Sequence, residues 1–395
     1  MEFAQARVCV IEQVRAALCE KPPAEMVDLA EAAGRVLAED IVADRDYPPS
    51  DRSIRDGFAL RAADVPGVLR VTGEVRAGQA ADVEVHPGEA VEITTGAPVP
   101  WGADSVVIVE HVERSNGHIR IAGTAGAGQY INLKGAEAAA GSILLRAGQR
   151  IGFAETAMLA TVGRSQVAVF RKPVVAILAT GDEIVEVHEN PQAHQIRNSN
   201  AYSLAAQVRR AGGEAVILPV ARDEHGSTRE LISRGLEHDL LLMSGGVSAG
   251  KYDIVERVLA DLGATFYFDR VLIQPGQPLV FGRARGTFFF GLPGNPASTM
   301  VTFEIFARAA LELLGGQSDV ALPMLWSRLA TNFRHKPGLT RFLPAQLTAD
   351  GSEFTPIRWQ GSSDVASMCR ANALMVVDAD REEWQAGDWM PVILK

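Results

Sequence analysis

The apolar residues near the N-terminus follow helical spacing. Val10, Val14 and Leu18 recur at intervals of four, and this spacing predicts an amphipathic helix. A second apolar segment, Met26–Leu37, lies beyond the helix-breaking pair Pro22-Pro23 and is also predicted as a helix. The first 45 residues therefore read as mainly helical.

The next stretch, from Asp51 to about Leu145, has a sequence pattern typical of a small mostly-β domain. Short β-rich runs alternate there with Gly and Pro turns. The runs are Leu69–Val71, Ala90–Thr94, Ser105–Val109 and His118–Ile121. A helical pattern returns over Phe153–Val162, and from about Leu322 to Lys395 the pattern is β-like again.

From Pro173 onward, predicted strands alternate with predicted helices. The expected strands are Val174–Leu178, Ala215–Val220, Leu240–Met243, Pro278–Gly282 and Thr287–Phe290. The expected helices are about Ala201–Ala211, Ser227–Gly235, Asp253–Leu262 and one after Asn295-Pro296. Such alternation predicts βαβ units, with a mostly parallel sheet and helices on both faces. Ligands of such sheets bind beyond the carboxyl ends of the strands.

Composition narrows the class of protein. The chain has 395 residues and a net charge of −10, which argues against a general nucleic-acid binder. No apolar run approaches the roughly 18 residues of a membrane span, and early acidic residues interrupt any signal-peptide core. Cys9, Cys19 and Cys369 lie far apart, which disfavours a zinc knuckle or a disulfide framework. We therefore expect a cytoplasmic protein that contacts neither nucleic acid nor membrane.

Three loops that follow predicted strands are rich in small and polar residues. They are Ala179–Glu183, Ser244–Gly250 and Gly291–Pro296. Glycine allows backbone N–H groups to approach an anion, and Asn295 with Pro296 suits a helix start whose dipole favours negative charge. The loops together predict a phosphate-binding edge, and the alternative for any single loop is a tight turn between strand and helix.

A near match to a nucleotide-binding loop lies in the second of these loops. Gly245–Tyr252 reads GGVSAGKY, with Tyr252 where a Walker A motif has Ser or Thr. No GxGxxG follows a strand, so a Rossmann dinucleotide site is not predicted. An ordinary P-loop NTPase is disfavoured, while adenylyl transfer from ATP stays open as an alternative.

Acidic residues recur at the same predicted sheet edge. Glu183 ends one strand, Asp223 follows another, and Asp253 opens a helix. Three carboxylates there could hold Mg²⁺ beside phosphates. The alternatives are a turn role for Asp223 and an N-cap role for Asp253. Asp56 lies in the mostly-β stretch, where an Asp-Gly turn is the simplest explanation.

Seven segments, in this order, resemble the molybdopterin molybdenumtransferase family (MoeA, and the E domain of gephyrin). They are Ser53–Ala59 (SIRDGFA), Thr95–Asp104 (TGAPVPWGAD), Thr180–Ile184 (TGDEI), Asn198–Asn200 (NSN), Ser244–Asp253 (SGGVSAGKYD), Pro275–Pro278 (PGQP) and Gly291–Pro296 (GLPGNP). Each segment alone is weakly specific, but together they are highly specific. The resemblance is strongest from Ser53 to Leu314.

The resemblance implies a multidomain α/β-plus-β fold. A central three-layer αβ domain, similar to adenylyltransferases, would be joined by a small mostly-β domain, a helical and extended N-terminal domain and a C-terminal β domain. The expected boundaries are 1–45 with 146–172 for the dimerisation domain, 46–145 for the small domain, 173–318 for the catalytic domain and 319–395 for the last. The resemblance also implies a homodimer with an active site at the subunit interface, and contact with the molybdopterin adenylyltransferase.

The implied reaction takes adenylylated molybdopterin and molybdate, hydrolyses the phosphoanhydride with Mg²⁺, releases AMP and inserts molybdenum. The implied catalytic positions are Asp56, Thr95, Glu183, Asp223 and Asp253, with Asp223 and Asp253 as metal ligands and Asp56 supplied by the partner subunit. The implied substrate-binding positions are Ser244, Gly245, Gly246, Ser248, Gly250, Gln274, Gln277, Pro293, Asn295, Pro296, Arg341 and Ser363, with Ser362 beside the last. A non-catalytic molybdopterin-binding or delivery protein is the alternative.

The chain departs from the family pattern at several positions. Gln274 and Gln277 replace two lysines, which removes charge from an oxyanion site unless Lys251, Arg341 or a helix dipole compensates. Asn132–Glu137 replaces an R-x-x-G-E-D stretch, and Arg55 replaces a typical Met beside Asp56. These changes bear on the catalytic efficiency of the implied reaction or on the choice of oxyanion. The sequence does not distinguish molybdate from tungstate as the substrate.

Overall fold

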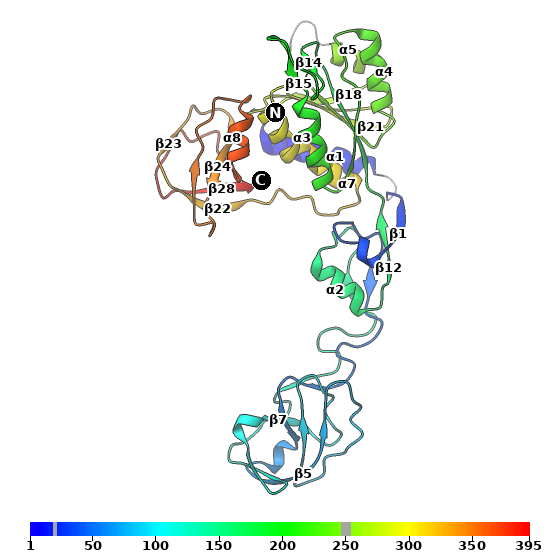
Figure 1. The fold of residues 1–395 in the computed structure, drawn as a ribbon, viewed down its shortest axis with the longest axis vertical. Helices are drawn as coiled ribbons and strands as arrows, with labels where there is room; N and C mark the ends of the chain where they lie inside the picture. The colour runs from blue at the N-terminus through cyan, green and yellow to red at the C-terminus, as the bar shows by residue number, and fades with distance from the viewer. Residues whose placement is uncertain (19–21, 246–253) are drawn as a thin grey trace. The chain divides into compact units, whose positions relative to one another are not determined.

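The computed structural model describes residues 1–18, 22–245 and 254–395, which form two compact units (Figure 1). Unit 1 comprises Met1–Ala38, Ala147–Gly152 and Gln166–Lys395, and unit 2 comprises Glu39–Arg146 and Phe153–Ser165. Among the described residues, no helix is long and apolar enough to cross a membrane.

A six-stranded sheet forms the centre of unit 1. In spatial order its strands are β16 (Glu214–Ile217), β13 (Val174–Ala179), β17 (Leu240–Ser244), β21 (Thr287–Leu292), β20 (Pro278–Ala284) and β18 (Thr265–Arg270). The first four run parallel, and β20 is antiparallel to both of its neighbours, β21 and β18. β13 and β17 are apolar at nearly every position because both of their faces are covered.

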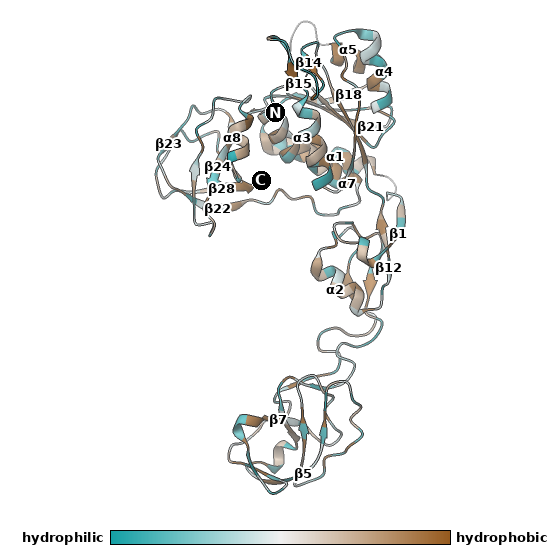
Figure 2. Ribbon diagram, viewed as in Figure 1, coloured by the Kyte–Doolittle hydropathy of each residue, from teal (hydrophilic) through white to brown (hydrophobic). Residues whose placement is uncertain are grey.

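Helices cover both faces of this sheet. One face packs against α1 (Phe3–Ala17), α3 (Ser199–Arg210), α6 (Pro296–Thr302) and α7 (Arg308–Leu314), and the other against α4 (His225–Gly235) and α5 (Ile254–Asp261). Alternate strand residues serve the two faces, since Leu242 joins the first core and Leu241 the second. In Figure 2 the strands between the helical layers are brown along much of their length, whereas α4 carries teal residues. The predicted three-layer αβ architecture is confirmed.

One predicted N-terminal helix is wrong. α1 forms as expected, but Ala24–Asp28 is strand β1, paired antiparallel with β12 (Gln166–Phe170), and a 3₁₀ turn (Leu29–Glu31) follows. Gly34 has a φ of +81°, which a right-handed helix does not permit. Met26 in β1 is 59% exposed, whereas Val36 and Leu37 are buried and form isolated bridges to Arg150 and Val169, so the spacing of these apolar residues did not report a helix.

Unit 2 contains a six-stranded sheet in the order β7 (Ser105–Ile108), β4 (Gly57–Leu60), β6 (Glu89–Ile93), β5 (Gly67–Val75), β9 (His118–Ile121) and β8 (Glu113–Ser115). All four predicted β-rich runs are strands, whereas β4 was not predicted. The unit also holds α2 (Phe153–Thr161), as predicted, and the pairs β2 (Ile41–Val42) with β11 (Ile143–Leu145) and β3 (Arg52–Ser53) with β10 (Ile131–Asn132).

The C-terminal part of unit 1 is a closed barrel of short strands. Its strands β24 (Thr340–Leu347), β25 (Glu353–Pro356), β22 (Leu325–Leu329), β28 (Trp389–Leu394) and β26 (Ala373–Val377) form a ring that the β24–β26 pairing closes. Helix α8 (Val365–Arg370) and the pair β23 (Phe333–Arg334) with β27 (Glu383–Trp384) flank the ring. Strand β19 (Ile273–Gln274), which precedes β20, pairs with β24 and joins the barrel to the αβ core.

Candidate active site

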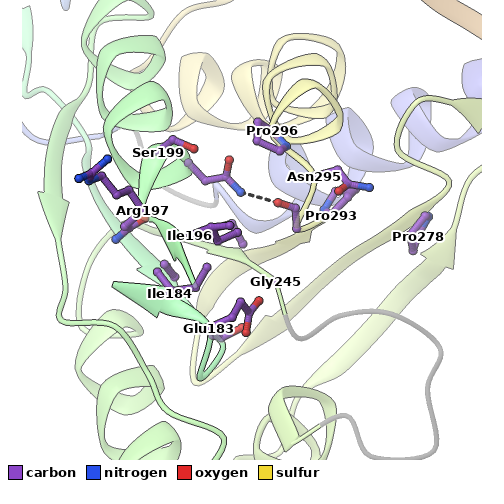
Figure 3. A pocket seen from close by; sticks show the side chains of 16 residues that line it. Glu183, Ile184, Ile196, Arg197, Ser199, Gly245, Pro278, Pro293, Asn295 and Pro296 are labelled. Carbon is purple, nitrogen blue, oxygen red and sulfur yellow. Dashed lines mark hydrogen bonds between the residues drawn. The ribbon is translucent and has the colours of Figure 1, made fainter. Parts of the chain in front are cut away.

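A cavity of about 370 Å³ lies at the carboxyl ends of β13, β17 and β21 (Figure 3). This is the sheet edge at which the three small-residue loops were expected to meet. Of the predicted residues, Glu183, Ser244, Gly245, Pro293, Asn295 and Pro296 line the cavity. Its other lining residues are Ala179, Thr180, Ile184, Ile196, Arg197, Asn198, Ser199, Asn200, Pro278 and Gly294.

The turn after β17 is closed against the turn after β13. The Thr180 N–H donates to the Ser244 carbonyl at 3.0 Å. Gly245 has a φ of +90°, and a Cβ there would lie 2.5 Å from the Thr180 carbonyl oxygen. Only glycine avoids both the left-handed strain and this close approach. The two turns therefore form one wall of the cavity.

A second wall comes from the short parallel pair β14 (Ile184–Val185) and β15 (Ile196–Arg197) and from the start of α3. Asn198 caps α3, since its Oδ1 accepts the Ala201 N–H at 3.2 Å. Asn200 Nδ2 donates to the Gly294 carbonyl at 2.8 Å, the bond dashed in Figure 3. Arg197, whose Nε donates to the Glu189 carbonyl, brings a positive charge to the lining.

Four buried polar atoms on these walls have no hydrogen-bond partner within the described chain. They are Thr180 Oγ1, Ser244 Oγ, Asn198 Nδ2 and Asn200 Oδ1. Buried polar atoms are normally paired, because leaving one unpaired costs about 1–3 kcal/mol. Their convergence on one cavity indicates a place where a polar ligand or ordered water completes the hydrogen bonding.

The start of α6 differs in detail from its prediction. Asn295 occupies the N-cap position and Pro296 the first turn, as expected, but the Asn295 side chain makes no cap bond. Its Nδ2 instead donates to Ser362 Oγ at 2.9 Å, and the Ser362 carbonyl accepts the Ala297 N–H at 2.9 Å. The helix start is thus joined to the C-terminal barrel. Ser363, the neighbouring predicted residue, does not line the cavity.

The acidic residues divide between the cavity and its border. Glu183 lines the cavity, whereas Asp223 does not. Burial raises the pKa of the Asp223 carboxyl, and the negative charges of Asp182 and Glu183 raise it further. The Asp223 N–H donates to Asp182 Oδ1 at 3.1 Å. Asp182 was not singled out, although it lies inside the TGDEI motif.

Gln274 and Arg341 form a contact of their own outside the cavity lining. Arg341 Nη1 donates to Gln274 Oε1, Nε donates to His335 Nδ1 at 3.0 Å, and Nη2 donates to the Lys336 carbonyl at 3.0 Å. Burial lowers the pKa of this guanidinium. Gln277 is held through its carbonyl, which accepts the Val271 N–H at 3.0 Å. Sequence reasoning did not identify His335, which lies between β23 and β24, six residues before Arg341.

The predicted residues of unit 2 also meet each other. Asp56 Oδ1 accepts the Thr95 N–H at 2.6 Å and the Thr95 hydroxyl at 2.8 Å. These two bonds lower the pKa of the Asp56 carboxyl, which favours its ionised form. Asp56 therefore does more than form a turn, since its side chain is positioned by Thr95. Its supply to the active site of a partner subunit stays a prediction.

Thr95 lines a second cavity of about 480 Å³, together with Arg52, Asn132 and Glu137. Asn132 Nδ2 donates to Glu137 Oε1 at 2.8 Å, so the segment that departs from the family pattern still presents an oriented carboxylate. Gly246, Ser248, Gly250, Lys251 and Asp253 lie outside the described residues. Within the described ranges, no group of three or more His, Cys, Asp or Glu side chains is arranged to hold a metal ion.

The chain matches three family descriptions in sequence order. These are the MoeA N-terminal region (domain I and II) over residues 1–163, a probable molybdopterin binding domain over 176–313 and the MoeA C-terminal region (domain IV) over 327–395.

Individual relatives agree with these descriptions. A molybdopterin molybdenumtransferase from Staphylococcus aureus is 32% identical over 94% of this chain and 91% of its own length. One from Nostoc is 39% identical over 74% of this chain and 70% of its own length. A crystal structure of a Pyrococcus molybdopterin biosynthesis MoeA protein is 33% identical with a TM-score of 0.74, covering 100% of this chain and 98% of that one. The chain belongs to the molybdopterin molybdenumtransferase family.

Proposed function

We propose that this protein inserts molybdenum from molybdate into adenylylated molybdopterin, with Mg²⁺-dependent hydrolysis of the phosphoanhydride and release of AMP. The observation that carries the proposal is the cavity at the sheet edge, where Thr180, Ser244, Asn198 and Asn200 each leave a buried polar atom unpaired. Hydroxyl and amide side chains suit phosphate oxygens and the edges of a pterin, because hydroxyl and amide groups can both donate and accept hydrogen bonds. Family membership supplies the reaction class.

The residues in the described part of the cavity suit hydrolysis of a phosphoanhydride. Arg197 offers a cation to a phosphate oxygen, and the Glu183 carboxylate can orient a water molecule or accept its proton. Gly245 contributes backbone alone to the cavity lining. These groups bind and position the reacting diphosphate, which is the larger part of catalysis in phosphoryl transfer.

We propose Asp223 and Asp253 as the ligands of the Mg²⁺ ion. The support among the described residues is the raised pKa of Asp223, which burial raises first and the negative charges of Asp182 and Glu183 raise further. Carboxylate oxygens are the donors that Mg²⁺ prefers. When bound, Mg²⁺ would neutralise phosphate charge. The four-domain division with boundaries near residues 45, 145, 172 and 318 likewise remains our proposal.

The test is AMP release from adenylylated molybdopterin, followed with and without molybdate and Mg²⁺. We expect Glu183→Gln to lower kcat at least about a hundredfold, since a positioned acid–base group typically contributes about 10²–10⁴-fold. Glu237→Gln is the matched control, because Glu237 is an exposed glutamate of unit 1 outside the cavity lining, and its kcat should equal that of the wild type. AMP release at the buffer rate by wild-type enzyme with bound substrate would contradict the proposal.

The same assay recognises the two alternatives. Gln274 and Gln277 in place of lysines favour a protein that binds and delivers molybdopterin, and such a protein binds substrate without releasing AMP. The near match to a Walker motif at Gly245–Tyr252 favours adenylyl transfer, which predicts ATP consumption that depends on molybdopterin.

We also propose a homodimer that receives its substrate from the molybdopterin adenylyltransferase by direct contact. Three exposed apolar side chains of unit 2 support self-association. Val42 and Ile143 are cross-strand partners of β2 and β11, and Phe153 at the start of α2 is 93% exposed. Phe153→Glu should shift the sedimentation coefficient to that of a monomer. Trp326→Glu, at an exposed position of unit 1, should not; an unchanged dimer in both variants would contradict this surface.

A further inference from the structure

An exposed tryptophan in unit 2 has no role in the site described above. The Trp101 side chain is 81% exposed, although exposing a large aromatic surface to water is costly. It lines a groove of about 950 Å³, together with segments 49–52 and 78–81, the rest of segment 98–103, Gly96 and Lys134. We call this cavity the Trp101 groove.

The backbone holds Trp101 in place. The Trp101 carbonyl accepts the Val85 N–H at 2.8 Å, and the residue forms a parallel bridge with Glu84. Pro100 fixes φ just before it, and Gly102 follows with a φ of +84°. A Cβ at position 102 would collide with the Val85 carbonyl. The indole is therefore presented from a preformed turn, which reduces the ordering cost of binding.

The groove also contains two cationic side chains. Arg52 has a buried Nε without a hydrogen-bond partner in the described chain. Lys134 lines the groove, and its Nζ lies 3.5 Å from Oδ2 of Asp46, which is not a lining residue. The acid in the lining, Asp51, already accepts the Lys134 N–H at 2.8 Å. A flat apolar ring surface beside two cations suits a planar ligand that carries negative charge.

The Trp101 groove adjoins the predicted catalytic residues of unit 2. Pro49, Arg52 and Gly96 line both this groove and the second cavity, which Thr95 also lines. A ligand in the groove would therefore lie next to the cavity of Thr95, the residue that binds the Asp56 carboxylate.

We infer that the Trp101 groove binds a planar heteroaromatic ring carrying a phosphate, with Trp101 stacked on the ring and Arg52 and Lys134 beside the phosphate. The inference rests on the proposed function for the identity of the ligand, because adenylylated molybdopterin contains two such rings, adenine and the pterin. Trp101 is thus a substrate-binding residue that lies inside the TGAPVPWGAD segment but is not among the site residues implied by the resemblance.

The experiment uses Trp101→Ala, Trp101→Phe and the control Trp326→Ala. Trp101→Ala should raise the KM for adenylylated molybdopterin about tenfold with a smaller change in kcat, since base–aromatic stacking contributes at this level. Trp101→Phe should stay within about twofold of the wild type because phenylalanine keeps an aromatic face. Trp326→Ala, at another exposed tryptophan, should not change KM.

A fluorescence titration identifies the ring and separates this inference from the proposed function. The change in tryptophan emission that wild type shows and Trp101→Phe lacks is the difference signal, and it reports only on the groove. The probes are AMP, a pterin monophosphate and orthophosphate. We expect one ring-bearing phosphate to quench this difference signal and orthophosphate not to. An unchanged KM in Trp101→Ala overturns the inference while turnover by the wild type upholds the proposed function. If the wild type does not turn over, the difference signal decides: quenching supports the groove, and no quenching overturns it.

Discussion

The turn after β17 offers a sharp test of how the cavity is built. Gly245→Ala adds a single methyl group, and two costs follow from the structure. A non-glycine residue at a φ of +90° costs about 1–2 kcal/mol. The new Cβ would lie 2.5 Å from the Thr180 carbonyl, and relieving such an overlap costs about 1–3 kcal/mol. We expect the free energy of unfolding to fall by about 2–5 kcal/mol.

Gly263→Ala is the matched control. Gly263 has a φ of +77°, but nothing lies within 4 Å of the place that an alanine methyl group would take, so its substitution carries only the backbone cost. The difference between the variants isolates the contact with Thr180, at about 1–3 kcal/mol. Thermal melting followed by circular dichroism should show Gly245→Ala several degrees below Gly263→Ala. AMP release should fall in Gly245→Ala but not in Gly263→Ala, because Gly245 lines the cavity and Gly263 does not. Equal melting temperatures and equal rates would refute the reasoning.

Three further predictions concern charge and capping. The pKa of Asp223 is raised in the folded state, so the stability that its protonated form contributes at low pH is lost as pH rises through the folded pKa. Asp223→Asn should therefore raise the melting temperature at pH 7 but leave it unchanged below about pH 3.8. The same variant should release AMP more slowly than the wild type. Asn198→Ala should cost about 1 kcal/mol through loss of the α3 cap, and Asn198→Ser should recover most of it in urea denaturation. Gln277→Lys should lower the KM for molybdate severalfold, with the gain reduced at high salt, whereas Gln274→Lys should gain less; equal gains would contradict the role given to Gln274.

The strands of the central sheet that the sequence predicts most clearly are those buried on both faces. β13 and β17 are covered on both faces, so their sequences are continuous apolar runs. The missed strand β18 lies at the sheet edge and is exposed at several positions, so it carries polar residues and a weak signal. β1 was misread because its pairing with β12, more than a hundred residues away, is not visible in local spacing.

The same division holds for the candidate site. Glu183, Ser244 and Asn295 could be brought together from the sequence, because parallel neighbours place their carboxyl ends at one edge. Asn198 and Asn200 could not be placed by that rule, since they follow the short pair β14–β15 rather than a strand of the main sheet. The family motif contained both residues but did not show that each lines the cavity and leaves a buried polar atom unpaired.

The glutamine at position 274 changes more than the local charge. A guanidinium has five N–H donors, and Arg341 uses three of them on Gln274, His335 and the Lys336 carbonyl. A lysine at 274 could not accept the Arg341 bond, and it would place a second cation against the first. Arg341 is therefore fixed in direction by the glutamine and still has two N–H groups to offer an oxyanion. Glutamine at 274 therefore removes the charge of a lysine but orients the guanidinium of Arg341. The side chain of Gln277 makes no described bond to Arg341, so the replacement at 277 only removes charge.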